Sequence, residues 1–424
     1  MLEAPSITVL IACFLVYLYV VWKGLKGDNR ISFYGPVALI RCRSCVEIIQ
    51  KIARLGLPHA AWLAVGTWIF SMLFGMVLLL QSALGSFALS PEQAPEPTTL
   101  IGLPGINPLI PLSYGLMGLV TAIFAHELAH GVTLVANGLA VKSAGIVYFG
   151  LPLGAFVEPS DEFQNAKTLV KTKTFSSGPF ANFLIAFLTL LILSSLSTNV
   201  SPTVQGIVVT YVAPETPAAQ AGIKPGDIIV GINNHSIRNG SDFHAFMKEK
   251  RAGENVVLHF HDGRRVTVTL ADRYYFTKND SERGMGFIGV KIVGVDELSR
   301  NLMFSISDKP IDFLRKIISF PLYMETMKYL EAALPQPFGD WELFYTLAWI
   351  AWMNLALGLT NSLPIVPFDG GSALKVVLET TLNRIPESRR SSIVNVFTLA
   401  VSLATIALIL APILVPRLKF LFHN

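Results

Sequence analysis

The sequence carries little charge. Only 15% of its 424 residues are Asp, Glu, Lys or Arg, whereas 52% are hydrophobic and the mean hydropathy is +0.53. Soluble globular chains typically contain about 25% charged residues, so this composition excludes an ordinary soluble protein and predicts a membrane protein. The net charge of +4 is small and unevenly distributed over loops, and it does not indicate nucleic-acid binding.

Cysteine is also scarce. The three cysteines, Cys13, Cys42 and Cys45, lie near the N-terminus, and the polar region beyond residue 200 has none. A fold stabilised mainly by disulfides is therefore excluded. Cys42 and Cys45 have a C-x-x-C spacing, but neither a second pair nor a histidine is near them in the sequence. We expect two ordinary thiols there, in preference to a redox or metal site.

Long hydrophobic runs are abundant. Because about 20 apolar residues cross a bilayer, the runs predict about six transmembrane helices. They are expected at residues 6–23, 61–83, 113–137, 179–197, 343–366 and 391–415. Basic residues follow the first run and do not precede it, so it is not expected to be a cleaved signal peptide.

The loops between these runs differ in charge. Loop 84–112 has no Lys or Arg, whereas basic residues are concentrated in loops 24–60, 138–178 and 367–390. Basic loops tend to stay in the cytoplasm, so we expect the N-terminus and region 198–342 on the extracytoplasmic side.

Two segments outside the long runs mix apolar and basic residues. Residues 31–56 predict an interfacial amphipathic helix, and residues 309–333 predict a similar helix interrupted by Pro321. Either could act as a gate, although a helix lying on the membrane surface is the simpler reading.

The polar stretch 204–293 changes character. It has short β-branched strand runs and an expected hairpin turn at Asp262-Gly263. The stretch AAQAGIKPGDII, which begins at Ala218, resembles the signature of PDZ domains associated with bacterial proteases. In that resemblance Gly286, Phe287 and Ile288 correspond to the loop that binds a peptide carboxylate. The fold class expected is therefore a polytopic α-helical membrane protein with an inserted α+β PDZ-like domain.

One apolar run contains the motif HELAH. Between Glu96 and Lys142 the only side chains that readily carry charge near neutral pH are His126, Glu127 and His130. A charged group near the centre of a bilayer costs about 2.5–3.5 kcal/mol, so chance is a weak explanation for this cluster. On a helix His126 and His130 share one face and can bind one zinc ion, while Glu127 beside them can transfer a proton.

The motif supplies two ligands, and a catalytic zinc usually takes three from the protein. No charged residue occurs between Glu342 and Asp369, and Asp369 closes the stretch NSLPIVPFDGG, which begins at Asn361. Asp369 lies at a depth in the membrane compatible with that of His126, so it is the preferred third ligand.

Together these motifs resemble the site-2 protease family of intramembrane zinc metalloproteases. The resemblance rests on HELAH in an apolar run, on N-x-x-P-x-x-x-x-D-G from Asn361 to Gly370, and on SGPFAN (177–182), expected at the head of the fourth span. It implies one Zn²⁺ held by His126, His130 and Asp369. It further implies Glu127 as general base and acid, and Asn361 as a donor to the substrate carbonyl or oxyanion.

Asn182 and a segment after the HELAH helix are expected to meet the substrate. The segment 143–162 alternates glycine with β-branched and aromatic residues. Gly154, Ala155, Phe156 and Val157 could form an edge strand to which an unwound substrate adds. A packed re-entrant loop is the open alternative.

The expected organisation has five parts. Residues 1–112 are expected to form an N-terminal transmembrane pair with an interfacial helix. Residues 113–200 and 343–424 are expected to form the two halves of the catalytic membrane core. Between these halves we expect the PDZ-like domain at 204–293 and an amphipathic linker at 294–342. The expected partners are the lipid bilayer and single-span membrane proteins, including substrates already cut by another protease, and no nucleic acid. The active site is expected toward the cytoplasmic leaflet of the cell membrane.

The function expected is regulated hydrolysis of peptide bonds within or near transmembrane helices. One alternative is a membrane zinc peptidase of the prenyl-protein or heat-shock type, whose third ligand is normally a glutamate. Another is an inactive PDZ-bearing membrane scaffold, in which nothing would retain Glu127 in an apolar helix.

Overall fold

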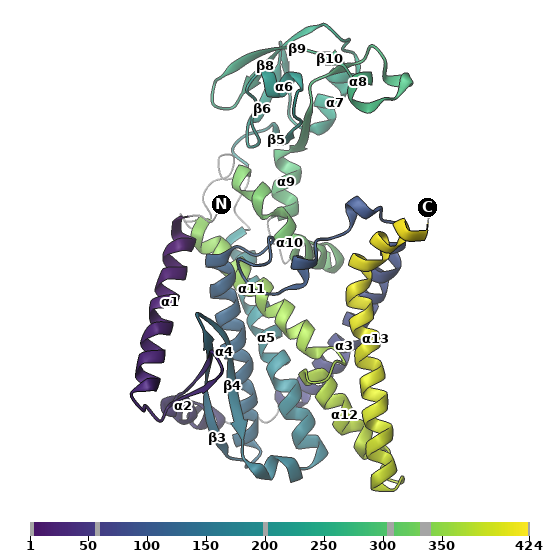
Figure 1. The fold of residues 1–424 in the computed structure, drawn as a ribbon. Helices are drawn as coiled ribbons and strands as arrows, with labels where there is room; N and C mark the ends of the chain where they lie inside the picture. The colour runs from purple at the N-terminus through teal and green to yellow at the C-terminus, as the bar shows by residue number, and fades with distance from the viewer. Residues whose placement is uncertain (1–3, 56–59, 198–201, 303–308, 331–340, 423–424) are drawn as a thin grey trace. The chain divides into compact units, whose positions relative to one another are not determined.

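The computed structural model describes residues 4–55, 60–197, 202–302, 309–330 and 341–422. The chain divides into two compact units, Met1–Thr189 with Thr346–Asn424, and Leu190–Tyr345 (Figure 1). The HELAH motif and the stretch from Asn361 to Gly370 lie in the first unit, and the polar stretch 204–293 lies in the second. Each unit is described by itself.

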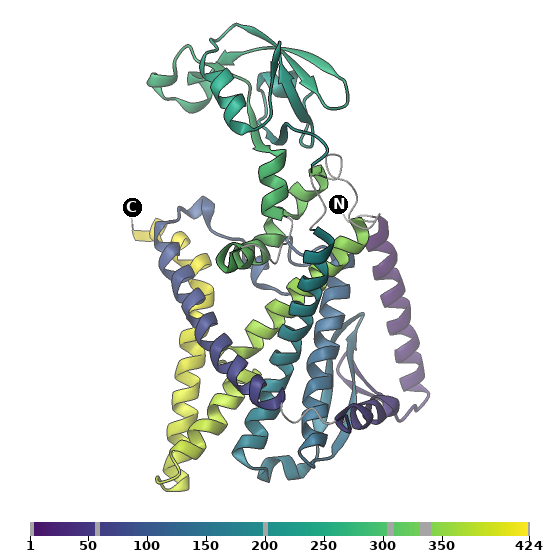
Figure 2. The ribbon, with the colours of Figure 1, turned by 180° about the vertical axis from the view of Figure 1, so that it is seen from behind.

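Long apolar helices dominate the first unit. They are α1 (Ala4–Leu25), α3 (Ala60–Gly85), α4 (Leu112–Ala136) and α13 (Glu387–Phe422), together with most of α5 (Thr168–Ser197) and α11 (Trp341–Ser362). Among the described residues, α3, α4, α5, α11 and α13 are long and apolar enough to cross a membrane. The corresponding part of α1 is Ile11–Leu25, which is shorter, so the span expected at 6–23 stays a prediction. Both views show α3 and α13 side by side (Figures 1 and 2).

The fourth span begins earlier than its hydropathy predicts. Helix α5 starts at Thr168, so the motif at 177–182 lies inside the helix and not at its head. The first turns of α5 contain Lys171 and Lys173, whose charges hide this part of the helix from a search for apolar runs. The motif is therefore held on a continuous helix, although Pro179 removes one backbone donor from it.

A four-stranded antiparallel sheet packs beside α4 in the first unit. Its strands are β1 (Ile31–Tyr34), β2 (Val37–Arg41), β3 (Val141–Phe149) and β4 (Leu151–Pro159), in that order. The turn between β3 and β4 is made by Gly150, whose φ of +66° favours glycine. Segment 143–162 therefore forms a hairpin and not an irregular re-entrant loop. Strand β4 is one of the two edge strands and contacts α4 (Figure 1).

Residues 31–56 are predicted to form one interfacial helix; of the described residues 31–55, those in α2 (Arg43–Ala53) are helical, and residue 56 lies outside the described part. Residues 31–41 form strands β1 and β2, so the helix prediction is wrong there. The turn at Gly35, with φ +60°, permits the hairpin, and pairing of β2 with β3 holds the strand that follows it. A helical pattern in the sequence could not anticipate a partner strand about a hundred residues away.

The two cysteines expected as thiols are joined. Cys42 is the N-cap residue of α2, Cys45 lies in its first turn, and the pair forms a disulfide with a Cα–Cα distance of 5.3 Å. The expectation of ordinary thiols is therefore wrong. A helix start places residues i and i+3 close together, which the sequence spacing permits but does not require.

The second unit contains an antiparallel sheet in the order β12-β5-β6-β8-β9, with β7 paired to β6. The strands are β5 (Ile207–Val212), β6 (Ile228–Ile232), β7 (His235–Ser236), β8 (Asn255–Phe260), β9 (Arg265–Thr269) and β12 (Val290–Gly294). Helices α6 (Pro217–Gln220) and α7 (Gly240–Lys248) accompany the sheet. The hairpin at Asp262-Gly263 is confirmed between β8 and β9. The unit is α+β as expected, and its assignment as PDZ-like stays a prediction.

Two helices follow this sheet, α9 (Val295–Leu302) and α10 (Pro310–Leu330). Helix α10 continues through Pro321, so the expected interruption is wrong. Residues 331–333 of the predicted segment lie outside the described residues.

Candidate metal centre

Helix α4 brings the two histidines of HELAH onto one face. His126 and His130 are one turn apart, and their ring centroids are 4.7 Å from each other with an interplanar angle of 87°. His126 is buried, and only 13% of the His130 side chain is exposed. The apolar composition of α4 drives this burial, and the imidazoles therefore need polar partners from other elements.

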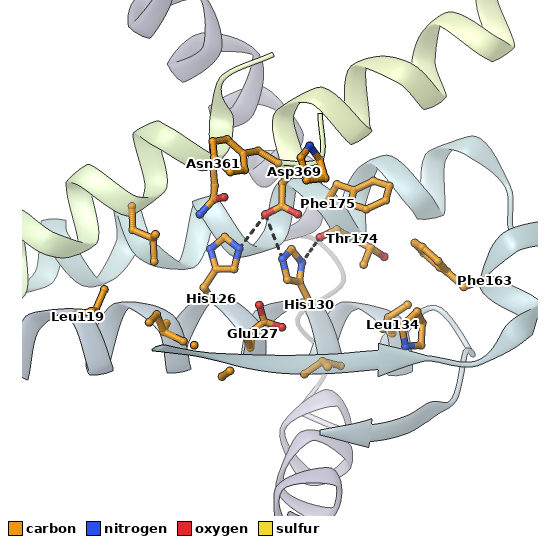
Figure 3. Close-up of a pocket in the computed structure, with 18 of the residues that line it drawn as sticks. Leu119, His126, Glu127, His130, Leu134, Phe163, Thr174, Phe175, Asn361 and Asp369 are labelled. Carbon is orange, nitrogen blue, oxygen red and sulfur yellow. Dashed lines mark hydrogen bonds and ion pairs between the residues drawn. The ribbon is translucent and has the colours of Figure 1, made fainter. Parts of the chain in front are cut away.

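The third partner comes from the start of helix α12 (Asp369–Thr381). Asp369 Oδ2 lies 2.8 Å from His126 Nε2 and 3.2 Å from His130 Nε2 (Figure 3). The three possible ligand atoms all lie within 4.8 Å of one another. The sequence prediction that Asp369 joins the two histidines thus agrees with the geometry.

Two glycines permit this approach of α12. A Cβ on Gly370 would clash with the backbone oxygen of Ser362, and a Cβ on Gly371 would clash with the backbone of Ile365. Both close contacts are with backbone atoms, which cannot move aside like a flexible side chain. The Asp-Gly-Gly stretch therefore has glycine where the chain folds back tightly against the end of α11.

The Nδ1 atom of each imidazole, on the side of the ring away from Asp369, faces a hydrogen-bond acceptor. His126 Nδ1 is 2.7 Å from Asn182 Oδ1, and His130 Nδ1 is 2.7 Å from the backbone oxygen of Thr174. A carbonyl oxygen can only accept, so each Nδ1 carries the proton and a neutral ring presents a lone pair on Nε2. This arrangement is typical of metal-binding histidines.

Three electron pairs then converge at one point. Asp369 Oδ2 is buried and meets no hydrogen-bond donor of suitable geometry among the described residues. When both rings are neutral, the two Nε2 atoms and this oxygen each present a lone pair at short distance, and they repel one another. A cation bound between them would remove this repulsion. Two imidazoles and one carboxylate are ligands that zinc accepts, and their number leaves room for a fourth ligand.

The space at this point is kept open by Gly178 of α5. A Cβ at residue 178 would lie 2.6 Å from the Nε2 atoms of both His126 and His130. Any larger side chain would enter the space toward which these nitrogens point. The glycine of SGPFAN thus contributes to the site by having no side chain.

A cavity of about 470 Å³ opens onto the three groups. Glu127 and Asn361 line it together with His126, His130 and Asp369 (Figure 3). Each site residue inferred from HELAH and from the Asn361–Gly370 stretch therefore reaches one cavity. The proton-transfer role of Glu127 and the donor role of Asn361 stay predictions.

Strand β4 forms part of the cavity wall. Gly154, Ala155 and Val157 line it, and the backbone of Val157 lies close to the Glu127 carboxylate. Phe156 does not line this cavity, but lines a second, apolar cavity that Ala155, Val157 and Glu127 also reach. Of the four strand residues proposed to meet substrate, three line the cavity at the candidate metal centre.

Asn182 lies beside the metal centre and not at the surface of the cavity. Its side chain is fully buried behind His126 and does not line the cavity. It bonds to His126, to the backbone of Ala122 and to Asn354. A role in orienting His126 accounts for these bonds better than contact with a substrate.

The residues of the expected carboxylate loop lie in the second unit. Gly286 and Phe287 form β11, which pairs with β10 (Ala271–Asp272). The N–H of Gly286 already donates to the backbone oxygen of Lys250, and the Ile288 side chain is buried in the core. Their assignment to carboxylate binding stays a prediction.

Sequence reasoning missed Thr174, Gly178 and Asn354 as parts of the site. Thr174 contributes a backbone oxygen, for which no side-chain signal exists. Gly178 is part of SGPFAN, and its helical spacing to Asn182 indicates that both residues lie on one face of the helix. Asn354 was detectable as an amide in an apolar run.

Comparison with known proteins adds independent information. Residues 114–405 match the family model described as Peptidase family M50. An uncharacterized protein of Methanocaldococcus jannaschii is 27% identical over 366 residues, which cover 84% of this chain and 81% of that protein.

Two metalloproteases match a smaller part of the chain. The zinc metalloprotease RasP of Geobacillus kaustophilus is 24% identical over 246 residues, covering 54% of this chain and 55% of that protein. The metalloprotease MmpA of Caulobacter vibrioides is 26% identical over 241 residues, covering 49% of this chain and 59% of that protein. The chain thus spans less than two thirds of the length of either metalloprotease.

Proposed function

The chain belongs to peptidase family M50, the site-2 protease family, and from this premise we propose that it is an intramembrane zinc endopeptidase. It is an integral membrane protein with five apolar helices of spanning length among its described residues. Its substrates, in this proposal, are single-span membrane proteins cut within or near their transmembrane helices, including proteins already shortened by another protease.

One observation carries the proposal. His126, His130 and Asp369 converge on one point between apolar helices, and Glu127 lines the same cavity. Zinc held by these three side chains would supply Lewis-acid chemistry to a peptide carbonyl and to water. Glu127 takes the proton from the attacking water and passes it to the leaving amine. Asn361, from the end of α11, donates to the oxygen on which negative charge develops.

The edge strand β4 suggests how an extended substrate is held. The backbone oxygen of Ala144 on β3 accepts a hydrogen bond from the N–H of Cys42, which follows β2. The polar backbone groups of Ala144 therefore point toward β2 and not toward β4. Val157, which lies opposite Ala144 on β4, then points its own N–H away from β3. Ala155, two residues earlier, has the same orientation. The N–H of Ala155 thus lies on the open edge of the sheet, where an unwound substrate segment can add as a further strand.

We expect Ala155→Pro to lower cleavage about tenfold, because proline removes one edge donor worth about 1.4 kcal/mol. The N–H lost does not take part in the ladder with β3, so zinc content and thermal stability should stay close to wild type. Cleavage rates of a single-span substrate provide the measurement. Ala155→Ser keeps the N–H and serves as the matched control; equal rates for the two variants would argue against strand addition.

The topology proposed from the loop charges places the N-terminus and the second unit outside the cytoplasm and the active site toward the cytoplasmic leaflet. If the second unit is PDZ-like, it either captures a newly formed C-terminus or excludes substrates with bulky outer domains.

The proposed function predicts where cuts fall. Full-length protein, reconstituted into liposomes with a panel of single-span peptides, should cut them inside or at the edge of the apolar segment. Mass spectrometry of the products locates each cut. Removal of zinc with a chelator should stop cleavage, and added zinc should restore it. Cuts confined to soluble flanks, or the same rate on a soluble peptide, would contradict an intramembrane endopeptidase.

A further inference from the structure

Two amide side chains meet in the apolar interior of the first unit. Asn182 of α5 and Asn354 of α11 are both fully buried. Asn182 Nδ2 donates to Asn354 Oδ1 over 3.0 Å. An amide without partners in such surroundings costs at least about 1–3 kcal/mol, so these groups must satisfy one another. The pair joins two helices through residues that are 172 positions apart in the chain.

The direction of every bond around this pair is fixed by backbone carbonyls, which only accept. Asn354 Nδ2 donates to the oxygen of Ile350 over 2.8 Å, which leaves Asn354 Oδ1 to accept from Asn182. Asn182 Nδ2 also donates to the oxygen of Ala122 over 2.8 Å. The amide oxygen of Asn182 is therefore the atom that faces His126 Nδ1, at 2.7 Å.

Close helix packing leaves these amides little freedom to rotate. A Cβ on Gly358 of α11 would lie 3.1 Å from Asn182 Cβ, and a Cβ on Gly118 of α4 would lie 2.6 Å from the oxygen of Trp349. The three helices thus approach one another at glycines on both sides of the amide pair. Loss of one amide partner cannot be repaired by a large movement of the other.

We propose that Asn354 is a positioning residue for the metal centre, acting through Asn182 on His126. Its oxygen holds the Asn182 amide in the orientation that keeps the proton on His126 Nδ1 and the lone pair on His126 Nε2. Asn354 does not line the catalytic cavity. The inference deepens the proposed function and rests on its metal site, because it assigns how α11 prepares a ligand carried by α4.

Asn354 also lies on the helix that carries Asn361. The two residues are two turns apart and therefore share a face of α11. One helix thus supplies the donor proposed for the substrate oxygen and, through the buried amides, sets the tautomer of a metal ligand. A shift of α11 would disturb both functions together.

Metal affinity tests the proposal without an activity assay. Cobalt and zinc dissociation constants are measured on purified full-length wild type, Asn354→Leu, Asn182→Leu and the double variant. Substitution of an outer partner of a metal ligand typically weakens binding about 10–100-fold, which we expect for Asn354→Leu. If Asn354 acts through Asn182, the double variant binds no more weakly than Asn182→Leu alone. The visible absorption spectrum of bound cobalt should change in the same variants.

Two further variants separate positioning from packing. Asn354→Asp keeps an oxygen that can accept from Asn182, and it should bind metal more tightly than Asn354→Leu. Thr398→Val removes a buried hydroxyl of α13 whose bond is to its own helix, and it should leave metal affinity unchanged. If Asn354→Leu does not fold, Asn354→Ala takes its place, since alanine also lacks the acceptor.

The outcomes are distinguishable. Wild type that binds no metal would contradict the proposed function itself. Wild type that binds metal, with Asn354→Leu within about twofold of it, would overturn the positioning role alone. Equal losses for the Leu and Asp variants, or additive losses in the double variant, would overturn it as well.

Discussion

Replacing Glu127 with glutamine is expected to lower the rate of peptide cleavage by about 10²–10⁴-fold, the range that general acid–base catalysis contributes. Glutamine has almost the same shape as glutamate, but its amide cannot accept a proton from water. Glu127 is not one of the three proposed zinc ligands, His126, His130 and Asp369, so the variant should retain one zinc per chain. Cleavage rate and zinc content are measured on the same purified sample.

The matched control is Glu158→Gln, which changes a partly exposed glutamate at the end of β4. Its contacts are with Ser143 and Lys142, away from the cavity, so activity should stay near wild type. Full activity in Glu127→Gln would show that another group transfers the proton. Loss of zinc together with activity would leave Glu127 with a role in metal binding and not in proton transfer.

Replacing Asp369 with asparagine is expected to weaken zinc binding by more than about 100-fold. This exceeds the loss of affinity, about 10–100-fold, that usually follows removal of a residue hydrogen-bonded to a metal ligand. The neutral amide keeps the shape of the side chain but removes the negative charge that offsets the metal cation. Its NH₂ group can also point at the two Nε2 atoms and occupy their lone pairs. Zinc affinity of the purified variant and its cleavage rate should fall together.

An exposed aspartate provides the comparison for this substitution. Asp161→Asn removes a charge whose partner is Lys142, and 86% of the Asp161 side chain is exposed. Exposed ion pairs contribute about 0–1 kcal/mol, so neither stability nor metal content should change much. Unchanged zinc affinity in Asp369→Asn would mean that the third ligand lies elsewhere. It would favour the membrane zinc peptidases in which a glutamate on a later helix binds the metal.

The residues that the sequence identified share one property. His126, Glu127 and His130 are polar groups in a run where apolar residues are the norm, and Asp369 is the first charge after a long gap. Burying such groups is costly, so their presence signals that they have partners. The helical period then places the two histidines on one face, and few candidates remain for the third ligand.

The parts that the sequence did not reveal depend on partners distant in the chain. Thr174 acts through its backbone oxygen, and Gly178 acts through the absence of a side chain. The bond between Asn182 and Asn354 joins residues whose neighbourhood is set only when α5 packs on α11. The strands at 31–41 likewise form because β3 is beside them. Local propensity carries no information about any of these contacts.

The Cys42–Cys45 disulfide shows the same limit on a shorter scale. The spacing allowed a pair of thiols, a redox site or a metal site, and the start of α2 selected the geometry in which the sulfurs meet. Helix α2 packs on α4, where Ile49 faces Gly131 next to His130. The sequence predicted a helix here but gave no reason to place it against the metal-binding helix.

An anomalous difference map, collected at the zinc absorption edge from crystals of the wild-type protein, tests the central claim most directly. We predict one peak per chain, about 2.0–2.2 Å from the Nε2 atoms of His126 and His130 and from a carboxylate oxygen of Asp369. A peak elsewhere, or no peak in protein that cleaves its substrate, would contradict the assignment of this cluster as the catalytic metal centre.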